Sequence, residues 1–335
     1  MPNSAAQHAS KPANLPLAVL SGDLSDAPES PRPVTLDTPR VGLHRLDQLW
    51  FQLTGTICNL ACTHCFISCS PTNDSFEFLP TEKVMTALDE APKHGTREVY
   101  FTGGEPFLHP DVLPILRRAL EIGPATVLTN GTLLHRKDTV EQLAAVRDGS
   151  IYSLEIRVSI DGPDADSNDA IRGKHSFDRA MRGVKLLVDA GFLPIITMAQ
   201  TWDDADAEAV YERMKSALNA VGYDRPRVKL LPSLKIGQEA LRDRGYDADE
   251  VVTKDMMTPE IASAMLCSHS RILTTKGWHV CPILIEQPDS VLGDDLETAT
   301  ASKYPLRHSA CFTCWLSGAI CSNASASASF KEQHK

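Results

Sequence analysis

The 335-residue sequence lacks the features that mark membrane, secreted and nucleic-acid-binding proteins. It has no run of 18 apolar residues, about the minimum for a helix that crosses a bilayer. Its first residues show no basic stretch followed by an apolar core, so we expect no secretory signal peptide. The formal net charge of −10 argues against a broad nucleic-acid footprint, although a local basic patch is compatible with it. We therefore expect a cytoplasmic protein with no membrane or nucleic-acid partner.

Cysteine, in contrast, is abundant. Without secretion, the nine cysteines indicate metal ligands rather than a disulfide framework. The length allows a large hydrophobic core and one smaller module, and the 42% hydrophobic content is ordinary for a globular protein.

Three of these cysteines lie within eight residues, in the segment Cys58-Asn59-Leu60-Ala61-Cys62-Thr63-His64-Cys65. Thiolates are soft ligands that select iron–sulfur clusters, zinc or copper(I). A 4Fe–4S cluster needs four ligands, so three cysteines leave one iron open to another molecule. The triplet alone also fits a zinc or disulfide knuckle.

The surrounding chain predicts an α/β fold. Residues 1–44 are expected to form a disordered or extended leader, with a short docking segment near Val41–Leu46, and Trp50–Ile57 a strand that runs into the cysteine loop. Further strands are expected at Glu98–Thr102, Ala125–Thr129, Leu154–Ile160, Pro194–Gln200 and Arg227–Leu231, and helices at Thr81–Lys93, Val112–Ile122, Lys137–Val146, Phe177–Ala190 and Asp204–Val221. This alternation predicts a partial (β/α)6 barrel of TIM-like type over residues 45–235, with its chemistry at the carboxyl ends of the strands.

A glycine pair follows the second predicted strand, in Thr102-Gly103-Gly104-Glu105-Pro106. Adjacent glycines allow positive φ angles and let a ligand approach the backbone closely. Glu105 is placed to accept a hydrogen bond from a cationic amine. Alone, the segment equally fits an ordinary connection between a strand and a helix.

The C-x3-C-x2-C loop, followed 38 residues later by Gly-Gly-Glu-Pro, resembles the radical S-adenosylmethionine (SAM) enzymes. The resemblance implies that Cys58, Cys62 and Cys65 hold a catalytic 4Fe–4S cluster whose open iron binds SAM. It implies that the Gly-Gly-Glu-Pro segment holds the methionine amino group. His64 takes a usually aromatic position that packs near the adenine. The cofactor-binding residues implied are His64, Gly103, Gly104, Glu105, Pro106, Asn130, Ser159, Asp161 and Arg172.

Two of these assignments have a simpler alternative. Ser159 and Asp161, in Ser-Ile-Asp-Gly-Pro, also fit a turn cap. Arg172 suits the SAM carboxylate because a guanidinium donates two parallel hydrogen bonds. Cys69 has no counterpart in the family pattern and is interpreted as a buried small hydrophobic residue.

The later cysteines resemble the auxiliary-cluster extension called SPASM or, in its shorter form, Twitch. The pattern consists of Cys267, a glycine before Cys281, and the pair Cys311 and Cys314. The resemblance implies one auxiliary 4Fe–4S cluster on these four cysteines, with Cys321 as an alternate ligand, in a module over residues 236–321. Structural zinc is the alternative, since four thiolates also bind zinc. Residues 274–280 are expected to form a hairpin, the C-x2-C segment a loop, and residues 322–335 a flexible tail.

The resemblance implies an enzyme that cleaves SAM reductively to a 5′-deoxyadenosyl radical, which abstracts a substrate hydrogen. An auxiliary cluster points to oxidation. We expect a small-molecule alcohol as substrate and a flavodoxin- or ferredoxin-type electron donor. Peptide modification by a maturase is the alternative substrate class. A non-enzymatic iron–sulfur electron carrier or redox sensor is the alternative of another kind, and it would need no Gly-Gly-Glu-Pro turn.

Overall fold

A nine-stranded, mostly parallel sheet forms the centre of the protein, whose computed structural model describes residues 31–318. The strands lie in the order β10-β9-β8-β2-β3-β4-β5-β6-β7, and β2 to β7 are parallel. These six barrel strands are β2 (Gln48–Gln52), β3 (Glu98–Thr102), β4 (Ala125–Thr129), β5 (Leu154–Ser159), β6 (Ile195–Ala199) and β7 (Arg227–Leu231). The expected α/β partial barrel is thus confirmed in its sheet and strand order.

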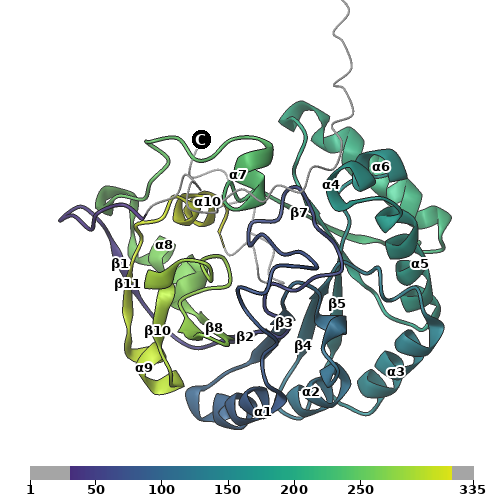
Figure 1. Cartoon of the computed structure of the whole chain (residues 1–335), viewed down its shortest axis with the longest axis horizontal. Helices are drawn as coiled ribbons and strands as arrows, with labels where there is room; N and C mark the ends of the chain where they lie inside the picture. Colours follow the sequence, from purple (N-terminus) through teal and green to yellow (C-terminus); the bar gives the residue numbers. More distant parts are fainter. Residues whose placement is uncertain (1–30, 319–335) are drawn as a thin grey trace, which may run out of the picture.

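Helices cover the outer face of this curved sheet, as Figure 1 shows for α1, α2, α3, α5 and α6. The barrel helices are α1 (Thr81–Glu90), α2 (Val112–Ala119), α3 (Lys137–Asp148), α4 (Ala165–Arg172), α5 (Ser176–Asp189) and α6 (Ala207–Ala220). None of the helices within residues 31–318 combines the length and the apolar character needed to cross a membrane.

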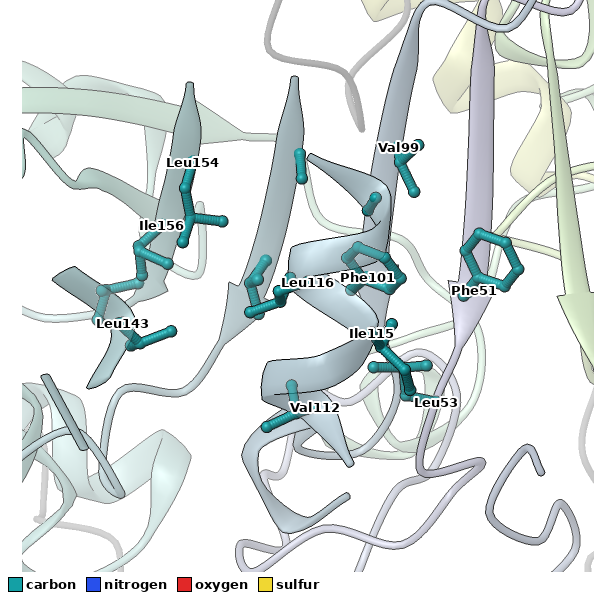
Figure 2. Close-up of a cluster of buried hydrophobic side chains, with 14 of the residues drawn as sticks. Phe51, Leu53, Val99, Phe101, Val112, Ile115, Leu116, Leu143, Leu154 and Ile156 are labelled. Atoms are coloured by element: carbon teal, nitrogen blue, oxygen red, sulfur yellow. The ribbon is translucent and has the colours of Figure 1, made fainter. Parts of the chain in front are cut away.

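The two faces of the barrel strands are occupied differently. Because successive side chains of a strand alternate between faces, Phe51 and Phe101 both point to the helix-covered outer face, where Figure 2 shows Phe101 near Ile115 of α2. Burying a side chain of this size stabilises the fold by about 1.5–3 kcal/mol. The neighbouring positions Trp50 and Tyr100 point to the opposite face, where their rings stack 4.2 Å apart. The large hydrophobic core therefore lies between the sheet and the helices. The inner face of the barrel strands carries a different set of side chains, among them Trp50 and Tyr100.

Two local elements differ from the sequence-based expectation. The strand expected over Trp50–Ile57 ends at Gln52, because Gly55 has φ +55° and a Cβ there would lie 1.9 Å from the Phe76 carbonyl oxygen. Helix α4 was not expected, since its eight residues are mostly polar. Its amino end is capped by Asp164, whose carboxylate accepts from the Ser167 amide at 2.9 Å.

The carboxyl-terminal part joins the barrel through the sheet itself. Strand β8 (Ser270–Thr274) pairs in parallel with β2 and in antiparallel with β9 (Gly277–His279), which forms the expected hairpin. Beside this hairpin, Figure 1 shows the rest of the module. Its other elements are β10 (Val291–Gly293), β11 (Lys303–Pro305), α7 (Gln238–Arg242), α8 (Pro259–Ala264), α9 (Leu296–Ala301) and α10 (Ala310–Ser317).

The amino-terminal segment also belongs to this module. Strand β1 (Arg40–Gly42) pairs antiparallel with β11, and Val41 is buried in the same hydrophobic cluster as the late cysteines. The C-x2-C pair lies on helix α10, which corrects the expected loop. Residues 1–30 and 319–335, with Cys321 and most of the expected leader and tail, lie outside the described residues.

Candidate active site and second cysteine cluster

A cavity of about 230 Å³ opens at the carboxyl ends of the barrel strands. Every strand from β2 to β7 contributes at least one residue to its wall, as the position of the chemistry in parallel barrels predicts. The strand residues that line it are Trp50, Gln52, Thr102, Leu128, Thr129, Arg157, Ser159, Thr197, Ala199 and Leu231. The cysteine loop and the start of the module close the remaining sides.

The three cysteines of the loop all line this cavity. Cys58 is fixed by its own amide, which donates to the Ser70 carbonyl at 3.1 Å, and a turn joins the Cys65 amide to the Cys62 carbonyl at 3.2 Å. Helix α4 holds the loop from the other side, because the Thr63 amide donates to the Ile171 carbonyl at 2.9 Å. The loop therefore presents its thiols to the cavity from a hydrogen-bonded frame.

Several N–H groups already point at the sulfurs. The Leu60 amide lies 3.4 Å from the Cys58 sulfur, and the Cys69 amide lies 3.2 Å from the Cys65 sulfur. The Asn130 side chain adds a donor 3.6 Å from the Cys58 sulfur. Donors to a ligand sulfur favour its thiolate form, which is the form that binds metal.

Burial opposes that ionisation in the absence of metal. It raises the pKa of Cys58 to about 11 and that of Cys62 to about 12, and the charge of Arg172 partly offsets the effect at Cys62. The hydrogen bond from the Cys69 thiol lowers the pKa of Cys65 below its ordinary value. A metal centre bound by all three sulfurs would release protons on binding. Cys69 is buried and lines the cavity beside them.

An ion pair under the loop organises the polar side of the cavity. The Asp161 carboxylate is fully buried and lies 2.5 Å from Arg172 Nε and 2.7 Å from His64 Nε2. It also accepts from the Ala199 amide at 2.7 Å. Although burial opposes ionisation, Arg172 and His64 hold the pKa of Asp161 well below its usual range. Asp161 thus fixes two cavity residues without lining the cavity itself.

The residues implied as SAM contacts divide into two groups. His64, Gly103, Gly104, Asn130, Ser159 and Arg172 line the cavity, whereas Glu105, Pro106 and Asp161 lie behind its wall. His64 Nδ1 is buried without a hydrogen-bond partner among the described residues, so it offers a polar contact to a bound molecule. These cavity-lining polar residues and the three thiols fit an iron–sulfur cluster with a polar cofactor beside it.

Glu105 binds the protein's own backbone. Its carboxylate accepts from the Phe107 amide at 3.2 Å, the Thr129 hydroxyl at 2.7 Å and the Asn130 amide at 2.8 Å. It therefore ties the loop after β3 to the end of β4. The adjacent glycines serve the same close packing, because a Cβ at Gly104 would lie 2.0 Å from the Ile57 carbonyl oxygen.

Replacement of Glu105 is accordingly expected to lower stability. Glu105→Ala removes the acceptor of three buried donors, and one such loss costs about 1–3 kcal/mol. Burial raises the pKa of Glu105 to about 7, so the folded state binds this proton more tightly than the unfolded chain. The carboxyl then contributes less stability as pH rises from about 4.5 to about 7, and the loss is larger at pH 5 than at pH 8.

Urea unfolding at both pH values measures this loss, with the exposed Glu121→Ala as the matched control. A Glu105→Ala protein as stable as the control, but with weaker SAM binding, would show that the carboxylate serves the cofactor instead.

A second cysteine cluster occupies the core of the module. Cys267, Cys281, Cys311 and Cys314 line one small apolar cavity and are each at most 7% exposed. Burial raises the pKa of every one of these thiols, so four ionised sulfurs need a compensating positive centre. Across residues 31–318, no three Cys, His, Asp or Glu side chains are arranged as ligands of a single metal ion.

The two cysteine sites are neighbours in the fold. Pro282, directly after Cys281, lines the barrel cavity, and so does Leu234, which belongs to the hydrophobic cluster around the second site. Phe66, directly after Cys65, packs against that same cluster. Sequence patterns did not single out two buried arginines, Arg157 on the barrel wall and Arg271 beside the second site. Arg157 lies at a cavity-facing strand position, which was the available signal, whereas Arg271 is in register with Leu49 and lies on the other face of the sheet.

Comparison with known proteins identifies the domain that contains the first site. Residues 53–214 match the model of the Radical SAM superfamily. The AdoMet-dependent heme synthase of Nitratidesulfovibrio vulgaris is 37% identical over 168 residues, which cover 50% of this chain and 44% of the relative. The mycofactocin maturase MftC of Mycolicibacterium smegmatis is 34% identical over 175 residues, covering 50% of this chain and 42% of the relative. The match thus spans less than half of either relative.

A solved structure extends the similarity in fold beyond the matched domain. Streptococcus suis SuiB bound to its precursor peptide SuiA aligns with a TM-score of 0.60 at 16% identity, covering 81% of this chain and 71% of that chain. The family implies a 4Fe–4S cluster and SAM, and the cavity residues fit both. Residues 53–214 of this chain therefore form a radical SAM domain.

Proposed function

We propose that this protein is a radical SAM oxidoreductase that removes a hydrogen atom from a small organic substrate held in the barrel cavity. The observation that carries the proposal is the meeting of Cys58, Cys62 and Cys65 with Asn130, Ser159 and Arg172 on the wall of one cavity. With its cofactors bound, this centre supplies a one-electron cleavage of SAM that yields a radical able to take that hydrogen.

The chain's own residues bind, orient and shield the reactants. The three cysteines hold the cluster, and Arg172, fixed by Asp161, faces the cavity as a partner for the SAM carboxylate. Apolar side chains form most of the remaining wall and exclude water from a reactive radical. The apolar wall residues include Trp50, Leu60, Phe66, Ile67, Leu128, Leu231 and Leu234.

The second cysteine cluster is proposed to hold one auxiliary 4Fe–4S cluster on Cys267, Cys281, Cys311 and Cys314. A single zinc ion needs four sulfurs about 2.3 Å from one point, whereas a cluster binds each sulfur through a different iron and suits more widely spaced thiols. All four thiols are buried, so the site is closed to substrate. Such a centre supplies an acceptor for the electron that the substrate loses on oxidation.

Two relatives bear on the substrate class. The AdoMet-dependent heme synthase is named for a small-molecule product. Peptide maturation is the second candidate, favoured by the similarity to MftC and by the SuiB fold with its bound precursor peptide. A flavodoxin- or ferredoxin-type protein is the proposed electron donor in either case.

An activity assay on fractionated cell extract separates the two candidates. The reconstituted protein, SAM and dithionite are mixed with either the small-molecule fraction or the peptide fraction, and 5′-deoxyadenosine is measured. We expect the small-molecule fraction to stimulate its formation severalfold, because substrate consumes the radical productively. Stimulation by the peptide fraction alone would replace the small-molecule proposal with peptide maturation.

A further inference from the structure

A buried arginine lies directly behind the second cysteine cluster. Arg271 is the second residue of β8, has 0% of its surface exposed and lies four residues after Cys267. Its Nη1 donates to the Cys267 and Ser270 carbonyls, each at 2.7 Å, and its Nε donates to the Ala299 carbonyl at 2.9 Å. A longer contact of 3.5 Å reaches the Val280 carbonyl, directly before Cys281. One guanidinium thus touches the backbone at both cysteine-bearing ends of the β8–β9 hairpin.

Among the described residues, the buried positive charge of Arg271 has no carboxylate beside it on the wall of the second cavity. Burial lowers the pKa of Arg271 to about 10, which leaves it protonated at neutral pH, and its charge attracts the ionised forms of Cys267 and Cys281. None of the described residues that line the second cavity is an Asp, Glu, Lys or Arg. The nearby Asp289 is bound by His308 at 2.9 Å. Neutral carbonyls alone are weak compensation for a buried cation, whereas four thiolates around a metal centre carry net negative charge.

We propose that Arg271 is a positioning residue of the four-cysteine centre, which holds the backbone at Cys267 and Cys281 and offsets the negative charge of the ligated thiolates. This inference rests on the proposed metal centre in the module. It does not depend on which metal is bound, because the charge of four thiolates is common to zinc and to a cluster.

The charge has a consequence for electron transfer. Reduction of a cluster adds one negative charge, so a nearby cation stabilises the reduced form more than the oxidised form. Arg271 is therefore expected to raise the reduction potential of the auxiliary centre. It would make that centre a better acceptor of an electron from the substrate.

Two replacements separate charge from hydrogen bonding: Arg271→Lys keeps the charge, and Arg271→Gln keeps donors without it. Both are made in a chain with Cys58, Cys62 and Cys65 changed to Ala, so that only the second centre contributes, with Arg118→Gln on the surface as the control. The midpoint potential is measured by reductive titration followed by electron paramagnetic resonance. At a fixed potential, we expect Gln to lower the ratio of reduced to oxidised cluster about tenfold relative to Lys, or 59 mV for one electron.

Equal potentials for the Lys and Gln variants would overturn the charge role, and so would failure of both to take up metal. If the centre holds zinc, the proposed electron-accepting function fails but this inference is still tested. Zinc loss to a chelator is then expected to be faster for Gln than for Lys, and equal rates would contradict the inference.

Discussion

Changing Cys58, Cys62 and Cys65 together to Ala is expected to lower the iron content from about eight to about four per chain, since each 4Fe–4S cluster contributes four irons. The three thiols line the barrel cavity, while the four thiols of the second site lie in a separate hydrophobic cluster. Loss of the first centre therefore leaves the ligands of the second intact. Iron and acid-labile sulfide are measured after anaerobic reconstitution.

Cys69→Ala is the matched control, because it removes a buried thiol of the same cavity that is not expected to be a ligand. Zinc in place of the remaining four irons would replace the auxiliary cluster with a structural zinc site. Loss of all iron in the triple variant would show that the second site holds none.

Replacing Arg172 alone by Met is expected to destabilise the protein by about 3–5 kcal/mol, the usual cost of leaving one partner of a buried ion pair uncompensated. Asp161 has no exposed side-chain surface, and Arg172 Nε lies only 2.5 Å from its carboxylate. The double change Arg172→Met with Asp161→Asn removes both charges and should cost less than the single change. Urea unfolding of both variants measures the difference.

The same change tests the role of Arg172 at the cavity wall. Loss of one charge-assisted hydrogen bond to SAM should weaken its binding roughly ten- to a hundredfold. Arg118→Met, on an exposed ion pair, serves as the control for both measurements. A double change that costs as much as Arg172→Met alone, or more, would contradict the coupling, and unchanged SAM affinity would remove Arg172 from the cofactor site.

The sequence predicted those parts of the molecule whose signal is local. The parallel order of β2 to β7 follows from short apolar strands that alternate with helices, and the β8–β9 hairpin follows from a glycine between two short strands. Gly277 has φ +114° there, which explains why the turn needs a glycine. The motif residues Cys58, Cys62 and Cys65 converge on one cavity because they share one loop.

Features that depend on contacts between distant parts of the chain could not be predicted from the sequence. Helix α4 has no apolar period and is held by the Asp164 cap and by its contact with the cysteine loop. The parallel pairing of β8 with β2, which joins module and barrel, leaves no local pattern. The motif predicts Glu105 as a cofactor contact but gives no sign of its hydrogen bonds within the protein. Its three backbone and hydroxyl donors come from residues up to 25 positions away.

Two pairs of adjacent residues link the two cysteine sites. Cys65 and Phe66 connect the first site to the hydrophobic cluster of the module, and Cys281 and Pro282 connect the second site to the barrel cavity. An electron-accepting centre beside the substrate cavity is consistent with oxidation chemistry. The proposed auxiliary centre would therefore lie where the module meets the barrel.

The cavity cysteines are proposed to support cleavage of SAM. The most direct test measures the 5′-deoxyadenosine formed by the anaerobically reconstituted protein with SAM and dithionite, with the triple Ala variant as the blank. We expect 5′-deoxyadenosine and methionine in equal amounts from the unaltered protein and none above background from the variant. Equal yields from both proteins, or no cleavage by a protein with a full complement of iron, would contradict it.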